Sequence, residues 1–354
     1  MKSFVYNGQP ARVVFGSGTI AKLPEEIERL GLKRVLVLAT PPQEAKARRL
    51  AASLSGLAVG VHAKAAMHTP ISVTEDALQV VAALQADGLV AVGGGSTTGL
   101  AKAIALRTDL PQIVMPTTYA GSEMTPILGE TKDGVKVTQS SPRVLPEVVI
   151  YDVDLTMTLP ASLSGTSGMN AIAHAVEALY ARESNPVIDR MATEAIGALV
   201  SALPVIAEKP HDRDARSKAL YGAWLCGICL GAVGMSLHHK LCHVLGGMFN
   251  LPHAETHAIV LPHAAAYNAA AAPEAMTRVA RALHSANAPQ GLFDLARQLG
   301  LPCALADIGM PEDGIVRAAE MAVRKPYANP RPIDHAPIEQ LIAAAWRGDA
   351  PAQD

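Results

Sequence analysis

Short apolar runs alternate with helical patterns through the first half of the chain, and this alternation constrains the fold more than any other feature. Runs of strand length lie at Val35–Ala39, Leu89–Val92, Gln112–Met115 and Val148–Tyr151. A run that is apolar at every position is typical of a parallel strand, because helices cover both faces of such a sheet. Helical periodicity between the runs then predicts a doubly wound sheet with right-handed crossovers.

The two halves of the chain have different patterns. Phe4–Tyr6 and Arg12–Phe15 also have the composition of short strands. After Pro160 the strand signal stops and only helical patterns follow. We therefore predict an α/β nucleotide-binding domain at residues 1–159 and an all-α domain at residues 160–354.

The composition excludes several classes of function. The formal net charge is -2, which favours neither nucleic-acid binding nor attachment to a membrane surface. The N-terminus MKSFVYNGQP lacks the apolar core of a signal peptide. Four cysteines and no such signal indicate a reducing compartment, so we expect a cytoplasmic protein.

One uncharged stretch, Ala219–Leu237, has the length of a membrane span. It contains four glycines and no comparable segment follows, so we interpret it as a buried helix. Cys226 and Cys229 have the spacing of a redox pair, but inside this apolar stretch they are expected to be buried thiols.

A glycine-rich turn, Gly93–Ser96, follows one predicted strand and opens a helix. Such a turn lets the backbone approach a phosphate at the helix N-terminus. Thr117 and Thr118 end the next strand at the same edge of the sheet, which favours a nucleotide site there. No acidic residue follows Val35–Ala39 to bind a ribose 2′-hydroxyl, so both NADH and NADPH remain open.

Six of the twelve histidines lie in one stretch of 26 residues, His238 to His263. His239 and His243 share a helical face, and we expect that helix to end at Gly246-Gly247 before a turn at Leu251-Pro252. Imidazoles bind metals or move protons near neutral pH. His238, His257 and His263 are expected to have structural roles.

An earlier helical pattern places Asn170 and His174 on one face. With His239, His243 and His253 they make four imidazoles and an amide. Three imidazoles and a carboxylate would be a good metal site, but Asn is a neutral and weak substitute. Metal binding is therefore disfavoured; if a metal is present, its ligands are His174, His239 and His253.

Several motifs in combination resemble the iron-containing alcohol dehydrogenase superfamily: GGGS, PTTYAGSEMT (Pro116–Thr125), GMNAIAHAVEALY (Gly168–Tyr180), LHHKLCHVLGG and LPHAETH. The resemblance covers nearly the whole chain. It implies the dehydroquinate synthase-like fold, an N-terminal α/β domain and a helical C-terminal domain with the active site in the cleft between them. Asn170 and the Asn329–Pro332 segment resemble the branch of maleylacetate reductases.

The resemblance assigns roles to individual residues. In metal-dependent relatives the positions of Asn170, His174, His239 and His253 bind iron or zinc, and the position of His243 lies beside the nicotinamide. Gly99 departs from the Asp that commonly follows GGGS. The cofactor contacts carry over to Gly94, Gly95, Ser96, Thr117, Thr118, Lys136 and Leu163.

The resemblance therefore implies reduction of the conjugated C=C of maleylacetate by NADH or NADPH, without metal, in a homodimer. His243 is the expected proton donor, and His174, His239 and His253 are expected to line the pocket. The dicarboxylate substrate calls for polar and cationic partners, and our candidates are Asn170, Lys240, Arg324 and Tyr327. Two alternatives remain: a metal-dependent alcohol dehydrogenase and a silent nucleotide-binding module.

Overall fold

The computed structural model describes residues 4–6, 8, 11–132 and 135–352, apart from the side chains of Val135 and Lys136. Internal contacts divide the chain into an α/β unit, residues 8–159, and a helical unit, residues 160–354, with which Phe4–Tyr6 are grouped. The predicted strand at Phe4–Tyr6 is wrong, since these exposed residues pair with none of the described strands.

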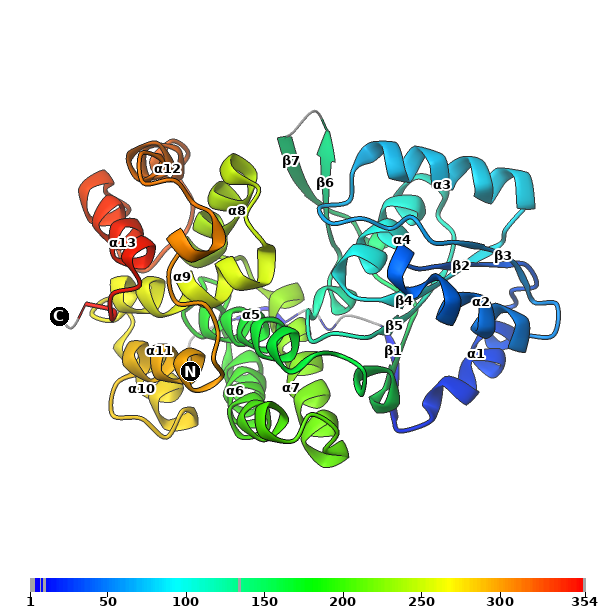
Figure 1. Ribbon diagram of the computed structural model, residues 1–354, viewed down its shortest axis with the longest axis horizontal. Helices are drawn as coiled ribbons and strands as arrows, with labels where there is room; N and C mark the ends of the chain where they lie inside the picture. The colour runs from blue at the N-terminus through cyan, green and yellow to red at the C-terminus, as the bar shows by residue number, and fades with distance from the viewer. Residues whose placement is uncertain (1–3, 7, 9–10, 133–134, 353–354) are drawn as a thin grey trace. The chain divides into compact units, whose positions relative to one another are not determined.

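Six parallel strands form the sheet of the α/β unit in the order β1-β8-β5-β4-β2-β3 (Figure 1). The parallel sheet predicted from the apolar runs is thus confirmed. In chain order the strands are β1 Arg12–Gly16, β2 Val35–Leu38, β3 Ala58–His62, β4 Gly88–Gly93, β5 Gln112–Pro116 and β8 Val148–Asp152.

Helices cover both faces of this sheet, which explains why its strands are apolar at every position. On β2, Val35 and Val37 belong to one buried cluster with residues of α1 and α2. Leu36 and Leu38 belong to another with residues of α3 and α4. Successive strand residues point to opposite faces, so each layer takes alternate side chains. The helices are α1 Leu23–Arg29, α2 Glu44–Ser53, α3 Ile71–Leu84 and α4 Gly95–Thr108.

The α/β unit also contains an antiparallel hairpin that the sequence patterns missed. Strands β6 (Ile127–Lys132) and β7 (Val135–Ser140) pair with each other and form a separate two-stranded sheet. Polar residues fill much of both strands, so the apolar runs that reveal the main sheet are absent here.

The helical unit contains nine α-helices, and none of its described residues lies in a strand. The predicted α/β plus all-α fold class is therefore confirmed. The helices are α5 Ala161–Tyr180, α6 Pro186–Glu208, α7 Arg213–Ala232, α8 Leu237–Phe249, α9 His253–Asn268, α10 Pro273–Ala282, α11 Ala288–Gln298, α12 Gly314–Val323 and α13 His335–Arg347.

The histidine-rich stretch differs from its prediction in the end of its first helix. Helix α8 continues through Gly246-Gly247 to Phe249, and its C-cap Asn250 has the left-handed φ of 52°. Neither glycine has a positive φ, so neither is in the conformation that caps a helix. Leu251 and Pro252 lie in the connection between two helices, where a turn was expected, and α9 then begins at His253.

The uncharged stretch Ala219–Leu237 is split between two helices. Helices α7 and α8 differ in direction by 94° across a short break. Cys226 and Cys229 lie buried in α7, and burial raises the pKa of both thiols, that of Cys229 to about 12. By length and composition α6, and α7 with α8 if taken as one bent span, could cross a membrane, but core helices share these properties.

Candidate active site

The first group of predicted cofactor residues gathers where β4 ends and α4 begins. Gly94 is the N-cap of α4, and no side chain caps this helix. A β-carbon at Gly94 would lie 2.9 Å from Cγ2 of Thr118, whereas Gly95 has open space to about 4 Å. The backbone amides at Gly95 and Ser96 therefore begin a helix N-terminus suited to a phosphate group. Thr117 follows β5 at the same edge, where its amide donates to the carbonyl oxygen of Gly93.

The edge of the sheet at the end of β2 carries no carboxylate between Ala39 and Gln43. Instead, Thr40 donates a hydrogen bond to Oε1 of Gln43 at 3.2 Å. The Gln43 amide in turn donates to the Thr117 hydroxyl at 3.2 Å. This neutral network neither binds a ribose 2′-hydroxyl through a charge nor repels a 2′-phosphate.

Lys102, on α4, holds the loop that follows Thr118. Its buried ammonium donates to the carbonyl oxygens of Ser122, Thr125 and Ile127 at 2.5, 2.7 and 2.9 Å, and to the Thr125 hydroxyl at 2.9 Å. These bonds attach Ser122, Thr125 and Ile127 to α4, the helix whose N-terminus is suited to a phosphate group. The sequence analysis missed Lys102, although a lysine inside the run Leu100–Ile104 was a usable signal.

Burial dominates the charges of this group. It lowers the pKa of Lys102 to about 7, although the neighbouring Glu123 raises it in part. Burial also raises the pKa of Glu123, whose carboxylate accepts a hydrogen bond from the Tyr151 hydroxyl at 2.8 Å. The group is internal to the α/β unit and therefore fixes the shape of the loop.

Three other positions singled out from the sequence lie elsewhere. Lys136 belongs to β7, and its side chain lies outside the described part of the structure. Leu163 lies in the first turn of α5, in the helical unit, and is 45% exposed. At Gly99 a β-carbon would lie 2.3 Å from Oγ1 of Thr69, so a side chain at this position would require the Thr69 hydroxyl to move.

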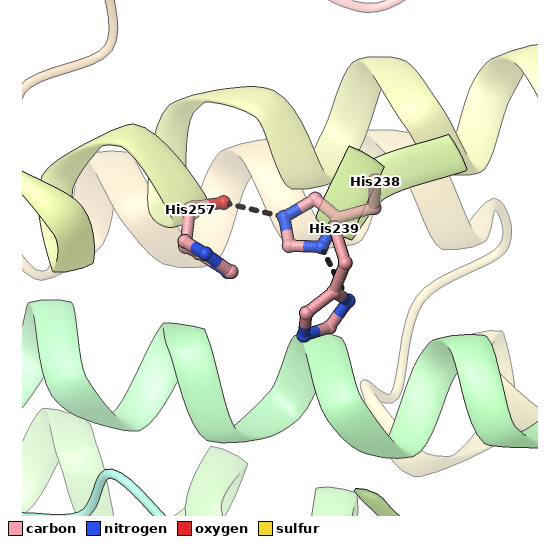
Figure 2. A group of neighbouring side chains, drawn as sticks. All are labelled: His238, His239 and His257. Carbon is pink, nitrogen blue, oxygen red and sulfur yellow. Dashed lines mark hydrogen bonds between the residues drawn. The ribbon is translucent and has the colours of Figure 1, made fainter. Parts of the chain in front are cut away.

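The histidine cluster of the helical unit is built from α5, α8 and α9. His238 and His239 come from α8 and His257 from α9, and their ring centroids lie 4.8 to 5.1 Å apart (Figure 2). His174 of α5 stacks on His239 at 5.0 Å, and His253 lies 4.2 Å from His257. Three helices thus bring five imidazoles together.

The most buried histidines of the cluster are two for which the sequence favoured structural roles. His238 and His257 are completely buried, whereas His174 and His239 are 4% and 6% exposed. His243 is exposed on α8, with its ring 6.4 Å from that of His239. His253 is half-buried at the start of α9. His263, also on α9, is buried without a ring contact to the others that the structure records.

Glu177 of α5 is the carboxylate of this cluster, and the sequence analysis did not single it out. It is completely buried and accepts a hydrogen bond from Nδ1 of His239 at 2.7 Å. It also accepts from the backbone amides of Ser236 at 2.9 Å and His238 at 2.8 Å. Burial by itself raises the pKa of Glu177, but the hydrogen bond and charge of His239 bring it below its usual value. Its spacing, three residues after His174, was the available signal.

Several buried polar atoms around Glu177 have no hydrogen-bond partner among the described residues. They are Oδ1 of Asn170, Nδ1 of His174, Nε2 of His239 and both ring nitrogens of His257. Burial lowers the pKa of His174 and His257 well below the usual range and that of His238 to about 4, with neighbouring histidines adding to the effect. These three imidazoles are therefore neutral near pH 7. The unpartnered ring nitrogens of His174 and His257 offer unused hydrogen-bonding capacity to a polar ligand.

The donor set offers a divalent metal only neutral ligands. Ring nitrogens of His238, His239 and His257 lie within 4.8 Å of one another. Nε2 of His238 already donates to the carbonyl oxygen of His257 at 3.1 Å, whereas His239 is bound to Glu177 through Nδ1 and keeps Nε2 open. Asn170 stands where the resemblance implies a charged ligand, so a metal here would meet imidazoles and an amide without a carboxylate.

The predicted substrate-binding residues are only partly brought together. Lys240, on α8, places its ammonium 5.8 Å from the ring centre of Tyr327. The hydroxyl of Tyr327 is buried without a partner among the described residues, and burial raises its pKa above the usual value for tyrosine, so it stays protonated. Arg324 is exposed at the end of α12. Arg331 stacks on Tyr267 at 4.3 Å and donates to its carbonyl oxygen.

Comparison with known proteins matches both units. The model of the iron-containing alcohol dehydrogenase family matches residues 10–153, and that of its C-terminal domain matches residues 164–346. The maleylacetate reductase of Rhizobium sp. strain MTP-10005 is 55% identical to this chain, over 99% of the chain and 100% of the relative.

Solved structures give the same result. The crystal structure of maleylacetate reductase from Agrobacterium tumefaciens superposes with a TM-score of 0.96 at 56% identity, over 99% of this chain and 100% of that one. An iron-containing alcohol dehydrogenase from Corynebacterium glutamicum is 42% identical with a TM-score of 0.92, over 98% of this chain and 97% of that one.

Proposed function

The chain belongs to the iron-containing alcohol dehydrogenase family of oxidoreductases, and from that premise we propose that it reduces maleylacetate to 3-oxoadipate with NADH or NADPH. The observation that carries the proposal is the 55% identity to maleylacetate reductases over nearly the whole chain. The neutral Asn170 beside buried imidazoles supports it, because this donor set suits an oxyanion better than a metal.

The nicotinamide, when bound, supplies a hydride to the alkene carbon β to the ketone of maleylacetate. The electron pair of the C=C then moves onto the ketone oxygen and forms an enolate. Protonation of the α carbon returns the electron pair and completes the saturated product. The protein therefore has to stabilise an enolate oxygen and deliver one proton.

The residues of the α/β unit supply the cofactor site in this proposal. Gly94, Gly95 and Ser96 hold the phosphates at the start of α4, and Thr117 and Thr118 contact the cofactor at the neighbouring strand end. Lys136 and Leu163 are further contacts implied by the family. The neutral edge at the end of β2 admits both NADH and NADPH.

The helical unit supplies the chemistry. We assign proton delivery to His243 and pocket-lining roles to His174, His239 and His253, and an N–H donor of this pocket would stabilise the enolate. Asn170 offers an unpartnered amide oxygen beside them. Our candidates for binding the substrate carboxylates are Lys240, Tyr327 and Arg324. The ammonium of Lys240 lies 5.8 Å from the ring centre of Tyr327, and Arg324 adds a cation at the end of α12.

We also propose a cytoplasmic homodimer. Strand β1 pairs with β8 on one side, and no described strand pairs with its other edge. An open edge of this kind is a template for a strand of a second copy. Phe4, Val5 and Tyr6 are exposed apolar residues that could be covered in the same assembly. Light scattering of the purified protein gives the oligomeric state directly.

A spectrophotometric assay tests the proposed activity. Purified protein is mixed with maleylacetate and either NADH or NADPH, and the nicotinamide absorbance is followed. We expect one reduced cofactor consumed per 3-oxoadipate formed, with no loss of rate after EDTA treatment. If neither NADH nor NADPH is oxidised, the proposed activity is wrong. An EDTA-sensitive reduction of a small aldehyde would favour the metal-dependent alcohol dehydrogenase.

A further inference from the structure

Glu177 joins two helices at the point where the histidine cluster begins. Ser236 is the N-cap of α8, and its own side chain makes no cap hydrogen bond. The carboxylate of Glu177, from α5, takes that place by accepting from the amides of Ser236 and His238. Carboxylates are favoured at helix N-termini because the amides and the helix dipole are positive there.

The same carboxylate determines which ring nitrogen of His239 carries hydrogen. An ionised carboxylate only accepts hydrogen bonds, so Nδ1 of His239, 2.7 Å from Glu177, must be the donor. His238 agrees with this arrangement. Its Nε2 lies 3.1 Å from the carbonyl oxygen of His257 and must donate, which leaves its Nδ1 as an acceptor 3.4 Å from Nδ1 of His239 (Figure 2).

We propose that Glu177 is a positioning residue that holds His239 in the Nδ1–H tautomer and leaves the buried Nε2 of His239 as the ring atom that meets the substrate. Both oxygens of Glu177 are occupied by donors from α8, so Glu177 itself does not touch the substrate. Nε2 of His239 has no partner among the described residues and lies in the group that includes Asn170 and His174. In this tautomer Nε2 accepts hydrogen bonds, so it would hold a donor such as a bound water or an enol hydroxyl rather than the enolate oxygen. That role rests on the proposed function; the tautomer does not.

The tautomer can be measured without any substrate. In the full-length protein labelled with ¹⁵N-histidine, NMR should show a ring proton on Nδ1 of His239 that exchanges slowly with water, assigned by its loss in His239→Gln. Glu177→Gln should remove this protected proton and Glu177→Asp should restore it. The matched control is Glu183→Gln, because Glu183 holds the amide of Gly234 in the same connection at 3.2 Å without a recorded contact to the cluster.

Kinetics then separate positioning from simple structural support. Glu177→Gln should lower kcat for maleylacetate about 10–100-fold, the usual range for an orienting partner, with the KM for NADH within about twofold. Glu177→Asp should recover most of this loss, and Glu183→Gln should behave like the parent.

Three results would overturn the inference. One is a parent spectrum in which Nδ1 of His239 carries no protected proton, which is decisive even if Glu177→Gln does not fold. Another is a folded Glu177→Gln protein with kcat within threefold of the parent. The third is an equal loss of kcat in Glu183→Gln, which would mean that the connection alone matters. A parent protein that binds NADH but does not turn over maleylacetate refutes the proposed function and leaves the NMR result to decide the role of Glu177.

Discussion

Lys102 in the α/β unit and Glu177 in the helical unit are both buried charged residues, but their surroundings differ. Lys102 is surrounded by four oxygen acceptors, which lie between Ser122 and the first residue of β6, Ile127. Glu177 is surrounded by donors from α8, and the side chains beyond those donors still have unpartnered polar atoms.

We interpret the surroundings of Lys102 as a supporting frame and those of Glu177 as the proposed reactive site. A buried polar atom without a partner costs about 1–3 kcal/mol, so a fold retains several together only where something else completes them. Around Lys102 the protein completes the network, and the result is a fixed loop beside the cofactor residues. Around Glu177 the network ends at Asn170, His174 and His257, which is the arrangement expected where a substrate supplies the missing partners.

The largest expected effect comes from His243, on the exposed side of the cluster. His243→Ala should lower kcat about 10²–10⁴-fold if this residue delivers the proton, with NADH binding unchanged because the cofactor frame lies in the other unit. Stopped-flow and steady-state rates with maleylacetate provide the measurement. His211→Ala, at an exposed position, is the control. A kcat within threefold of the parent would remove His243 from the mechanism.

A smaller effect is expected at His263, a buried histidine outside the recorded ring contacts. Burial lowers its pKa from 6.5 to about 4, with Asp349 opposing this in part. Between pH 6.5 and pH 4 the unfolded chain therefore binds this proton and the folded protein does not. The free energy of unfolding of the parent should fall by about 3 kcal/mol over that range. His263→Leu should not incur this loss.

Urea unfolding of both proteins at pH 7 and pH 4.5 measures the difference. The free energy of unfolding should fall less in the variant than in the parent as the pH is lowered. The same difference in free energy between the two proteins at both pH values would contradict the lowered pKa of His263. Hydrogen exchange over the same pH range should show the helical unit opening before the α/β unit, because the histidines with lowered pKa lie in the helical unit.

The smallest effect is expected at Lys102. Lys102→Met keeps the length of the side chain but leaves the carbonyl oxygens of Ser122, Thr125 and Ile127 without their donor, which should cost about 2 kcal/mol of unfolding free energy. The KM for NADH should rise while kcat at saturating NADH stays close to the parent value. Unchanged stability and unchanged KM would mean that the loop does not depend on this ammonium. A fall in kcat as large as the rise in KM would contradict the proposed separation, because Lys102 would then affect the reactive site as well as the supporting frame.

The fold was largely predictable because its strongest signals are local. Strands such as Val35–Leu38 are apolar at every position, and only burial on both faces explains that pattern. The errors arose where local signals conflict with context. Gly246-Gly247 is compatible with a helix when its packing requires one, and α8 continues through both glycines. The β6–β7 hairpin has too few apolar residues to be recognised.

The site was less predictable than the fold. Asn170, His174 and His239 were identified from residue type and helical spacing, and the structure brings His174 and His239 into contact. Only the tertiary structure shows the places of His238, His257 and Glu177 in the cluster, because spacing along one helix does not say which face meets another helix. Glu177 and Lys102 each had a weak signal in the sequence, but their roles come from the atoms around them.

By itself, then, the sequence determined the fold class, the family and the neutral residue at position 170, because these depend on residue types and periodicities that local chemistry sets. Only the tertiary structure decided which imidazoles meet, which ring nitrogens remain unpartnered and where the carboxylate of Glu177 lies. The physical reason is that helices α5, α8 and α9 are separate in the sequence and meet through packing. Distances of 2.7 to 5 Å between their side chains are properties of that packing rather than of any one segment.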